Sequence, residues 1–600
     1  MTRALALLED AIAALALLAM VILPLLEILL RRVLGVGIPG SGPIVQHLTL
    51  WVGFLGAAIA ARDGKLLALA SGTLIPAGPM RRASEIVSAL VAAGIGTILA
   101  WGGVELALSE RMTGSTLGAN IPIWVAQLVL PIGFALIALR QVRRASAGWG
   151  GRTIASLGIV AGVVIMRTPG LLEGRTPWPG LLIVFLAGVL GTPIFVILGG
   201  AAVLLFMSDA VTPAAVLIET YALSVSPTLP AIPLFTLAGF LLAEGQASAR
   251  LLRVFRAWFG WIPGGTAVVC AFLCSFFTVF TGGSGVTILA LGGVLFPALL
   301  KDGYRERFSL GLMTAAGSLG LLLPPALPLI LYGVVAQIPI EDLFIGGILP
   351  GILLTLMIAA WGVREGIVSG AGRQRFHVSE GLASLWDAKW ELAMPFVALV
   401  AIFSGIATAV ESAALVALYA LVVQTVVHRD LSVRRDLLRV CTECAMVVGG
   451  VLVILGVAVG FTNYLVGAQI PAKMLAWSQQ NIHSKIVFLL MLNLFLLAVG
   501  WLMEIFAAIV VVVPLIVPLG DAFGIHPVHL GIIFIANLEL GFLTPLVGIN
   551  IFLASYRFKR PVLEVARAAL PMMAILGVGV LLITYVPWLT LAILEMLGRV

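Results

Sequence analysis

Long apolar stretches, separated by short polar ones, follow one another along almost the whole chain. A helix needs about 20 predominantly apolar residues to cross the hydrocarbon core of a bilayer, and by that measure the chain carries roughly 15 to 17 membrane segments. Some of these segments are short or broken by glycine and proline. The pattern predicts an all-α polytopic membrane protein in which several membrane segments are interrupted.

Four of the segments lie within residues 1–150 and predict a four-helix scaffold domain. The first is expected to be a retained span, because Glu9 and Asp10 interrupt its charged end and no small-residue cleavage site follows before Arg31. A basic cluster after the fourth span marks its side, and the amino terminus, as cytoplasmic. The spans are residues 1–30, 48–61, 86–108 and 121–139, and the cluster is Arg140, Arg143, Arg144 and Arg152.

Residues 151–178 form a connecting helix and loop. Their apolar part, residues 154–166, is shorter than a full span, so whether it crosses the membrane stays open. A single crossing here would let two modules with opposite terminal sidedness be joined. Residues 179–600 form the predicted transport domain, with two inverted repeats at about 179–363 and 391–600 and the longest polar stretch of the chain between them.

One apolar stretch, residues 277–332, is interrupted twice. The Gly-Gly-Ser-Gly sequence at residues 282–285 cannot hold an undisturbed helix, because glycine adds backbone freedom and serine competes for backbone hydrogen bonds. Three prolines between residues 324 and 328 remove backbone donors. In lipid, freed backbone groups persist only where protein or a polar cavity satisfies them. The stretch therefore predicts a re-entrant hairpin at an ion or solute site, with carbonyls for a cation and half-helix N-termini for an anion.

Residues 504–552 repeat this pattern 221 positions later, without a gap. Two matching interrupted segments, one in each half, indicate a repeat-built secondary transporter with a site at the repeat interface. The alternative is a pair of ordinary proline-kinked helices, but kinks alone would not produce the shared spacing. The matching pairs are Pro297 and Pro518, Gly303 and Gly524, Gly320 and Gly541, and Pro324 and Pro545.

The composition removes several classes of function. With 61% apolar residues, 10% charged residues and a mean hydropathy of +1.15, the chain is no ordinary soluble protein. The net charge of +7 comes from basic residues at segment ends, so it indicates orientation in the bilayer and no nucleic-acid partner. The sequence contains no G-x-x-x-x-G-K-[ST] loop, so neither ATP drive nor an ATPase subunit is expected. Cys441 and Cys444 have metal-like spacing but no second pair, which favours packing.

Several motifs resemble those of one transporter family. They are TGGSGVT with the downstream FPALLKDGY, AAGSLGLLLPPALPLILYG, GIATAVESAALVALYAL, VVPLIVPLGDAFGIHPVHLGIIF and NLELGFLTPLVGINIFLAS. Through them, residues 177–598 resemble the large membrane subunit of tripartite ATP-independent periplasmic (TRAP) transporters. Residues 1–150 are similar to the small membrane subunit, through Arg31-Arg32 and the ARDGK sequence that ends at Lys65. The chain therefore resembles the two subunits fused.

This resemblance implies a mechanism and a location. A soluble periplasmic substrate-binding protein captures the solute, usually an organic anion with a carboxylate, and docks on a multi-pass unit in the bacterial inner membrane. Inward sodium flow drives uptake, and the repeat-bearing part moves against a scaffold in an elevator-like way. Sodium ions are the coupling ions, no other cofactor is implied, and the protein is not expected to be an enzyme.

The chain departs from the family pattern at three places. Thr408-Ala-Val-Glu411 stands for the usual Thr-Pro-Thr-Glu, and Thr544-Pro-Leu stands for Thr-Pro-Pro. Gln46-His47 stands where the small subunit commonly has acidic residues. Thr408, Glu411, Thr544 and the later Gly548 are nevertheless present.

The interrupted segments supply the candidate site residues. Sodium is a hard cation that takes several oxygens, and broken helices offer carbonyls and hydroxyls. We assign one ion to Gly283, Ser284, Ser318 and Gly320, a second ion to Thr408, Gly541, Thr544 and Gly548, and the solute side to Asn550, Glu411 and Glu539. Each hydroxyl has an alternative role as a back-bond to its own helix. Each acid, including Glu504, could instead be hydrogen-bonded within the bundle or lie near an interface. His529 is expected to be a cap-region residue at a helix start.

Two other classes of function stay open at this stage. One is a stand-alone ion-coupled carboxylate carrier without a soluble receptor, which uptake by the chain alone would identify. The other is a membrane enzyme or proton-pump subunit, which would need cofactor ligands or chains of buried acids, whereas the six histidines are scattered mostly at segment ends. The solute, the choice between sodium and protons, and the oligomeric state do not follow from these residues.

Overall fold

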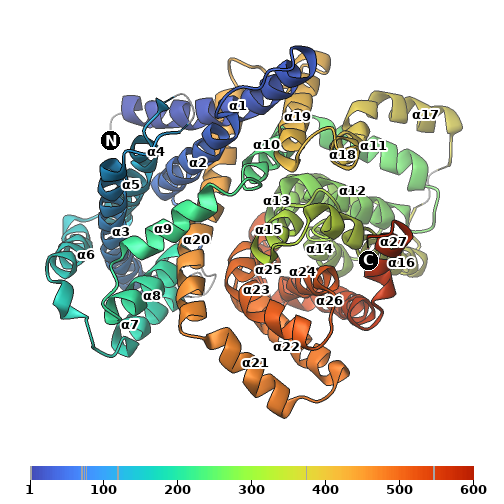
Figure 1. Cartoon of the computed structure of the whole chain (residues 1–600). Helices are drawn as coiled ribbons and strands as arrows, with labels where there is room; N and C mark the ends of the chain where they lie inside the picture. The colour runs from blue at the N-terminus through green and yellow to red at the C-terminus, as the bar shows by residue number, and fades with distance from the viewer. Residues whose placement is uncertain are drawn as a thin grey trace. The chain divides into compact units, whose positions relative to one another are not determined.

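The computed structural model describes residues 3–68, 72, 75, 78–117, 120–372, 375–544 and 548–599. Throughout that part of the chain the regular elements are helices, without strands (Figure 1). Twelve of the described helices are long and apolar enough to cross a membrane, and six shorter apolar helices have 10–17 residues. The prediction of an all-α polytopic membrane protein is confirmed.

The helices group into two compact units. The first unit contains Met1–Leu234 and Arg434–Pro471, and the second contains Phe235–Val433 and Ala472–Val600. Every candidate site residue belongs to the second unit.

The first unit is built around one long buried helix, α20 (Leu437–Gly467). Small residues let its backbone touch that of α2. A Cβ on Gly56 would lie only 1.9 Å from the carbonyl oxygen of Ala445, so a larger residue would not fit there. A buried ion pair between Glu9 and Arg140, at 2.5 Å, joins α1 to α5. The other helices are α1 (Arg3–Val33), α2 (Ser41–Asp63), α3 (Pro79–Thr113), α4 (Ile123–Gln127), α5 (Val129–Arg144), α6 (Trp149–Arg167), α7 (Trp178–Val189), α8 (Ile194–Ser208) and α9 (Ala214–Ser224).

The apolar segment predicted at residues 154–166 lies inside α6, which has 19 residues and is long enough to span. It packs against α3, and a Cβ on Gly158 would lie 2.0 Å from the carbonyl oxygen of Leu90. α6 is therefore long enough to cross the membrane, which the apolar segment of 13 residues at 154–166 alone did not decide.

In the second unit, helix boundaries recur at the offset that the glycines and prolines indicated. α13 (Ser284–Lys301) and α23 (Ile505–Ala522) match at both ends, each 221 residues apart. The turn glycines that follow them, Gly303 and Gly524, both have positive φ. The other pairs, which agree to within a few residues, are α12 (Gly265–Thr281) with α22 (Lys485–Leu502), α14 (Glu306–Ala316) with α24 (Pro527–Gly541), α15 (Leu327–Ala336) with α25 (Ile549–Phe558), and α16 (Ile340–Ser369) with α26 (Val562–Tyr585).

These matched helices also pack reciprocally. α13 of the first repeat packs on α25 of the second, while α15 of the first packs on α23 of the second. Likewise α14 packs on α26 and α16 packs on α24. Exchanging the two repeats converts each contact into its partner contact, which is the pattern of a two-fold relation. The two interrupted segments therefore meet at the centre of one unit, where Figure 1 shows their helices gathered.

A buried charge network holds α11, which comes directly before the matched helices of the first repeat. α10 (Ala231–Glu244) and α11 (Ala247–Phe259) meet at a 76° bend, and Arg250 on α11 contacts Glu391 of α18 (Lys389–Phe403) at 2.6 Å. The same guanidinium donates to Asp430 at 2.8 Å. Burial alone would raise the pKa of Asp430, but hydrogen bonds from Arg250 and from the Gln246 N–H outweigh it and hold that pKa below its usual range.

Candidate ion and solute site

The first interruption places two helix ends against each other. α12 ends at Thr281 and is capped by Gly282, whose φ of 63° is the left-handed conformation that glycine adopts freely. α13 then begins at Ser284 after an extended Gly283. A Cβ on Gly282 would lie 2.2 Å from Cδ1 of Leu327, so glycine is required for space as well. The predicted break is confirmed, and it sets the last carbonyls of α12 beside the first N–H groups of α13.

Three buried threonines surround this break. The Thr278 hydroxyl oxygen lies 2.8 Å from that of Thr287 and 2.8 Å from the carbonyl oxygen of Gly317. Thr281 lies 3.2 Å from Thr287 and 3.4 Å from the carbonyl oxygen of Gly283. Thr278 also reaches its own helix at the Cys274 carbonyl, at 2.8 Å.

This threonine cluster has more oxygen contacts than protons. A hydroxyl carries one donor hydrogen and two lone pairs, so Thr278 can donate to only one of its three close oxygens. Facing lone pairs of hydroxyls and carbonyls are the ligands of hard cations. Sequence reasoning did not assign these three threonines, although Thr278, Thr281 and Thr287 flank the Gly-Gly-Ser-Gly break within ten residues.

The turn between α14 and α15, residues 317–326, completes the first neighbourhood. Ser318 is fully buried and donates to the carbonyl of Ala315 at 3.1 Å, which is the back-bond alternative, yet its lone pairs remain. A Cβ on Gly320 would lie 2.2 Å from the Ser275 carbonyl oxygen, so this turn rests directly on α12. Ser284 is buried, and a Cβ on Gly317 would lie 3.1 Å from its carbonyl oxygen.

The second interruption has the same backbone plan with different chemistry. α22 ends at Leu502 and α23 begins at Ile505, with Glu504 as N-cap. The Glu504 carboxyl group accepts from the N–H of Phe506 at 3.0 Å and so satisfies one of the free donors at the start of α23. Glu504 stands 221 residues after Gly283, so a carboxylate occupies the place of the glycine.

Gly541, Thr544 and Gly548 are brought together in the second turn. Thr544 donates to the Gly541 carbonyl at 2.6 Å, and the Gly548 N–H donates to the Thr544 carbonyl at 3.1 Å. A Cβ on Gly541 would lie 2.7 Å from the backbone of Gly500, so this turn rests on α22. Pro545 and Leu546, which belong to the predicted break, lie outside the described residues.

Glu539 points from the second repeat toward the turn of the first. It is 1% exposed, stands 221 residues after Ser318, and neither of its carboxylate oxygens has a hydrogen-bond partner among the described residues. The backbone N–H of Leu321 lies toward it and donates to the carbonyl of Ser318. An acid in this position meets both interrupted segments.

Asn550 joins the two repeats directly. Its side-chain amide, fully buried on α25, donates to the carbonyl of Thr314 on α14 at 3.2 Å. Its amide oxygen has no hydrogen-bond partner among the described residues, so it can accept one.

Thr408 and Glu411 lie elsewhere in the unit. Thr408 is exposed and is the N-cap of α19 (Ala409–Val422), and the pair forms a reciprocal capping box. The Thr408 N–H donates to Glu411 at 2.8 Å, and the Glu411 N–H donates to Thr408 at 3.2 Å. Among the described helices, α19 packs on α18 and on the π-helical turn η4 (Val423–Val427), whereas α24, which ends three residues before Thr544, packs chiefly on α22 and α26.

Two histidines share the start of α24. His526 is the N-cap and accepts from the Val528 N–H, while His529 lies within the first turn. His529 is buried between its helix and the last two, with ring nitrogens 3.1 Å from the Thr590 hydroxyl and 3.3 Å from the Thr584 carbonyl. His529 therefore lies in the cap region, as predicted, and its ring packs against the last two helices.

The chain matches two family models. One is described as "Tripartite ATP-independent periplasmic transporter, DctM component" and matches residues 180–589. The other is described as "Tripartite ATP-independent periplasmic transporters, DctQ component" and matches residues 20–150.

Individual proteins are similar over most of the chain. The isethionate TRAP transporter permease protein DctMQ of Oleidesulfovibrio alaskensis is 33% identical over 498 residues, which are 81% of this chain and 77% of that protein. The C4-dicarboxylate TRAP transporter large permease protein DctM of Pseudomonas aeruginosa is 35% identical over 67% of this chain and 93% of its own. The ectoine/5-hydroxyectoine TRAP transporter large permease protein UehC of Ruegeria pomeroyi is 31% identical over 60% of this chain and 84% of its own.

Proposed function

This chain belongs to the TRAP transporter family, with both membrane components in one polypeptide, and from this premise we propose that it takes up a small organic anion by coupling to sodium. It is a multi-pass protein of the inner membrane and a permease rather than an enzyme. The observation that carries the proposal is the meeting of two interrupted segments, one per repeat, whose helices pack reciprocally. Paired broken helices at a repeat interface are where secondary transporters bind solute and coupling ion.

The first segment supports a sodium site. Gly283, Ser284, Ser318 and Gly320 lie around α12, and the three threonines of the cluster add hydroxyl oxygens that exceed their own donor hydrogens. A cation among these oxygens would relieve the facing lone pairs without a carboxylate cage. The second ion belongs to Gly541, Thr544 and Gly548, where carbonyls and one hydroxyl converge. Thr408, as N-cap of α19, would join them only after a rearrangement.

The solute is proposed to be of the carboxylate type. The relatives are named for isethionate, C4-dicarboxylates and ectoine, which are all small polar solutes. The Asn550 amide and the N-terminus of α13 offer donors to an anion at the repeat interface, and Glu539 would limit how much negative charge enters. Glu411, in the capping box of α19, would act on the solute only after a rearrangement. Members of the family work with a periplasmic substrate-binding protein, and we propose such a receptor as partner here, with the repeat-bearing unit as the elevator-like moving part.

Reconstituted uptake tests this function. In proteoliposomes, uptake of a carboxylate solute should need both the binding protein and an inward sodium gradient. Ser284→Ala and Thr544→Ala should raise the sodium concentration for half-maximal uptake, whereas Thr97→Ala, a back-bonded threonine of α3 in the first unit, should not. Unchanged sodium titrations in both site variants would contradict the assignment. Uptake by the chain without any receptor would instead identify a stand-alone carrier.

A further inference from the structure

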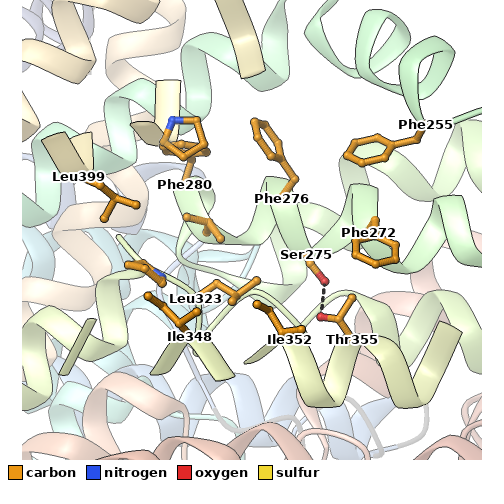
Figure 2. A pocket seen from close by; sticks show the side chains of 13 residues that line it. Phe255, Phe272, Ser275, Phe276, Phe280, Leu323, Ile348, Ile352, Thr355 and Leu399 are labelled. Carbon is orange, nitrogen blue, oxygen red and sulfur yellow. Dashed lines mark hydrogen bonds between the residues drawn. The ribbon is translucent and has the colours of Figure 1, made fainter. Parts of the chain in front are cut away.

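A pocket of about 330 Å³ lies inside the second unit, beside the first interrupted segment (Figure 2). Its walls come from α11, α12, α16 and α18, and the turn residues Leu323 and Pro324 close one side. Figure 2 shows four phenylalanines around it, Phe255, Phe272, Phe276 and Phe280, opposite Ile348 and Ile352 of α16. All of these residues belong to the same compact unit.

The side chains that line the pocket do not favour a polar ligand. Its two hydroxyls, Ser275 and Thr355, lie 3.0 Å apart and bond to each other, as the dashed line in Figure 2 shows. Each also reaches a carbonyl of its own helix, Ser275 that of Ala271 and Thr355 that of Gly351. Among the described residues, no lining side chain has a buried polar atom without a hydrogen-bond partner. A carboxylate or a cation would therefore lose its hydration there without compensation.

Apolar side chains at the edge of the pocket are exposed. The lining residue Ile352, on the 30-residue α16, is 42% exposed. On α18, Phe396 is 67% exposed one residue after the lining Pro395. In a membrane-spanning helix, exposed side chains of this kind meet lipid. A ligand that enters from this side comes from the bilayer.

The volume and the position of the pocket fit the acyl chain of a lipid. The volume is about twice that of an apolar cavity of roughly 150 Å³ that binds benzene. Phe255 of α11 lines one end of the pocket. The same helix carries the exposed Arg253 and Trp258, and the exposed Trp261 follows two residues after its end. Tryptophan and basic residues together mark the headgroup level of a membrane protein. A lipid whose headgroup lies near α11 can extend a chain along α12.

We propose that this pocket binds one acyl chain of a bilayer phospholipid, which packs against the turn of the first interrupted segment. α12 separates two faces: Ser275, Phe276 and Val279 line the pocket, while Thr278 belongs to the threonine cluster. The turn itself is held by the N–H of Leu323, which donates to the carbonyl of Gly320. The bound chain supports the wall on which the ion site rests. This consequence for transport rests on the proposed function, but the binding itself does not.

Photo-crosslinking of the full chain tests the binding. The protein is reconstituted in vesicles that contain a trace of phospholipid with a diazirine in its acyl chain, irradiated and mapped by peptide mass spectrometry. Crosslinks should concentrate on the peptides of α12 and α18 that line the pocket. Ile348→Trp fills the pocket and should lower these crosslinks several-fold, to the level of other lipid-facing helices.

Leu356→Trp is the matched control, because it places the same side chain on the same helix, on the lipid-facing surface outside the lining. It should leave the crosslinks on α12 and α18 unchanged. Crosslinks spread evenly over all lipid-facing helices, or an equal loss in both variants, would overturn the proposal. So would α12 and α18 crosslinks that persist in Ile348→Trp.

An uptake assay on the same vesicles separates the two proposals. If the pocket supports the ion site, Ile348→Trp should change the sodium dependence of uptake several-fold and Leu356→Trp should not. Absence of sodium-driven uptake in the unmodified chain would contradict the proposed function while leaving the crosslink result intact. Crosslinks lost in Ile348→Trp with unchanged uptake would keep the lipid site and remove its link to transport.

Discussion

The two interrupted segments share one backbone and carry different side chains. α13 and α23 begin and end at the same offset, and the glycines Gly320 and Gly541 bring each turn onto the helix before the break in its own repeat, α12 or α22. The hydroxyls do not recur, because Val499, Leu502 and Ala508 stand in the places of Thr278, Thr281 and Thr287. Carboxylates appear in the second segment instead, with Glu504 for Gly283 and Glu539 for Ser318.

The two repeats therefore share a backbone geometry but differ in the chemistry of their side chains. The first segment has neutral oxygens with surplus lone pairs, suited to a cation, whereas the second has a self-capping carboxylate at a helix start. The apolar pocket follows the same division, since Asn493 replaces Phe272 and bonds to Asn537 and Thr584. The two segments thus present unlike side chains at a symmetric interface.

The largest expected effect concerns the charge anchor at α11, which is the buried network of Arg250, Glu391 and Asp430. Arg250→Met should destabilise the protein by about 3–5 kcal/mol, because Glu391 is 1% exposed and would lose its main partner. The second repeat has Pro471 at the matching position, on a helix, α21 (Ile470–Asn481), that is largely exposed. Unfolding of the purified protein measures the change.

Arg253→Met on the same helix is the control, since its partner Asp387 is 41% exposed and surface pairs contribute little. Because the pKa of Asp430 is lowered, the stability that this network contributes depends on pH. A lowered folded-state pKa gives stability that is present above the unfolded value of about 4 and is lost as the pH falls through the folded value. Arg250→Met should therefore reduce the acid sensitivity of unfolding, and an unchanged pH profile would contradict the anchor.

Changes at the matched positions Ser318 and Glu539 test whether only the second repeat tolerates a buried acid. Ser318→Glu would place a second carboxylate in a fully buried turn, and it should destabilise the protein by at least about 2.5 kcal/mol. Glu539→Gln keeps the shape and removes the charge, so it should leave stability equal or higher. Thermal unfolding in detergent compares the two. Equal losses in both would mean that the turns do not differ in this respect.

The shared geometry is tested by a single methyl group. Gly320→Ala and Gly541→Ala should each cost about 1–3 kcal/mol, since the new Cβ would meet backbone atoms 2.2 Å and 2.7 Å away. Gly577→Ala is the control, because its Cβ would lie 3.8 Å from Leu540 in ordinary contact. If only one of the two turn variants is affected, the repeats are not equivalent in backbone.

The smallest effect concerns the threonine cluster. Thr278→Val should raise the sodium concentration for half-maximal uptake by roughly fivefold, which corresponds to about 1 kcal/mol for one lost polar contact. The reverse change in the second repeat, Val499→Thr, should leave the titration unmoved. Sodium titration of uptake in proteoliposomes distinguishes them, and a similar shift in both variants would remove the asymmetry.

Much of the fold could be predicted from local signals. The break at residues 282–285 follows from the freedom of glycine, which is a property of a few neighbouring residues. The role of Glu504 as the N-cap after the second break became visible only in the structure. The 221-residue offset was visible in glycines and prolines because they control the backbone directly. The place of Thr408 did not follow, since a capping box and an ion ligand have the same local sequence.

The sequence alone determined the membrane class, the repeated interruptions and the family, because each depends on apolar length, backbone breakers or short motifs close together in the chain. Only the tertiary structure decided which oxygens face one another. The Gly317 carbonyl reaches Thr278, Asn550 reaches Thr314, and Glu539 turns toward Leu321, across separations of 39 and 236 residues for the first two. Such contacts depend on how whole helices pack, and packing is set by many apolar surfaces at once rather than by the residues that meet.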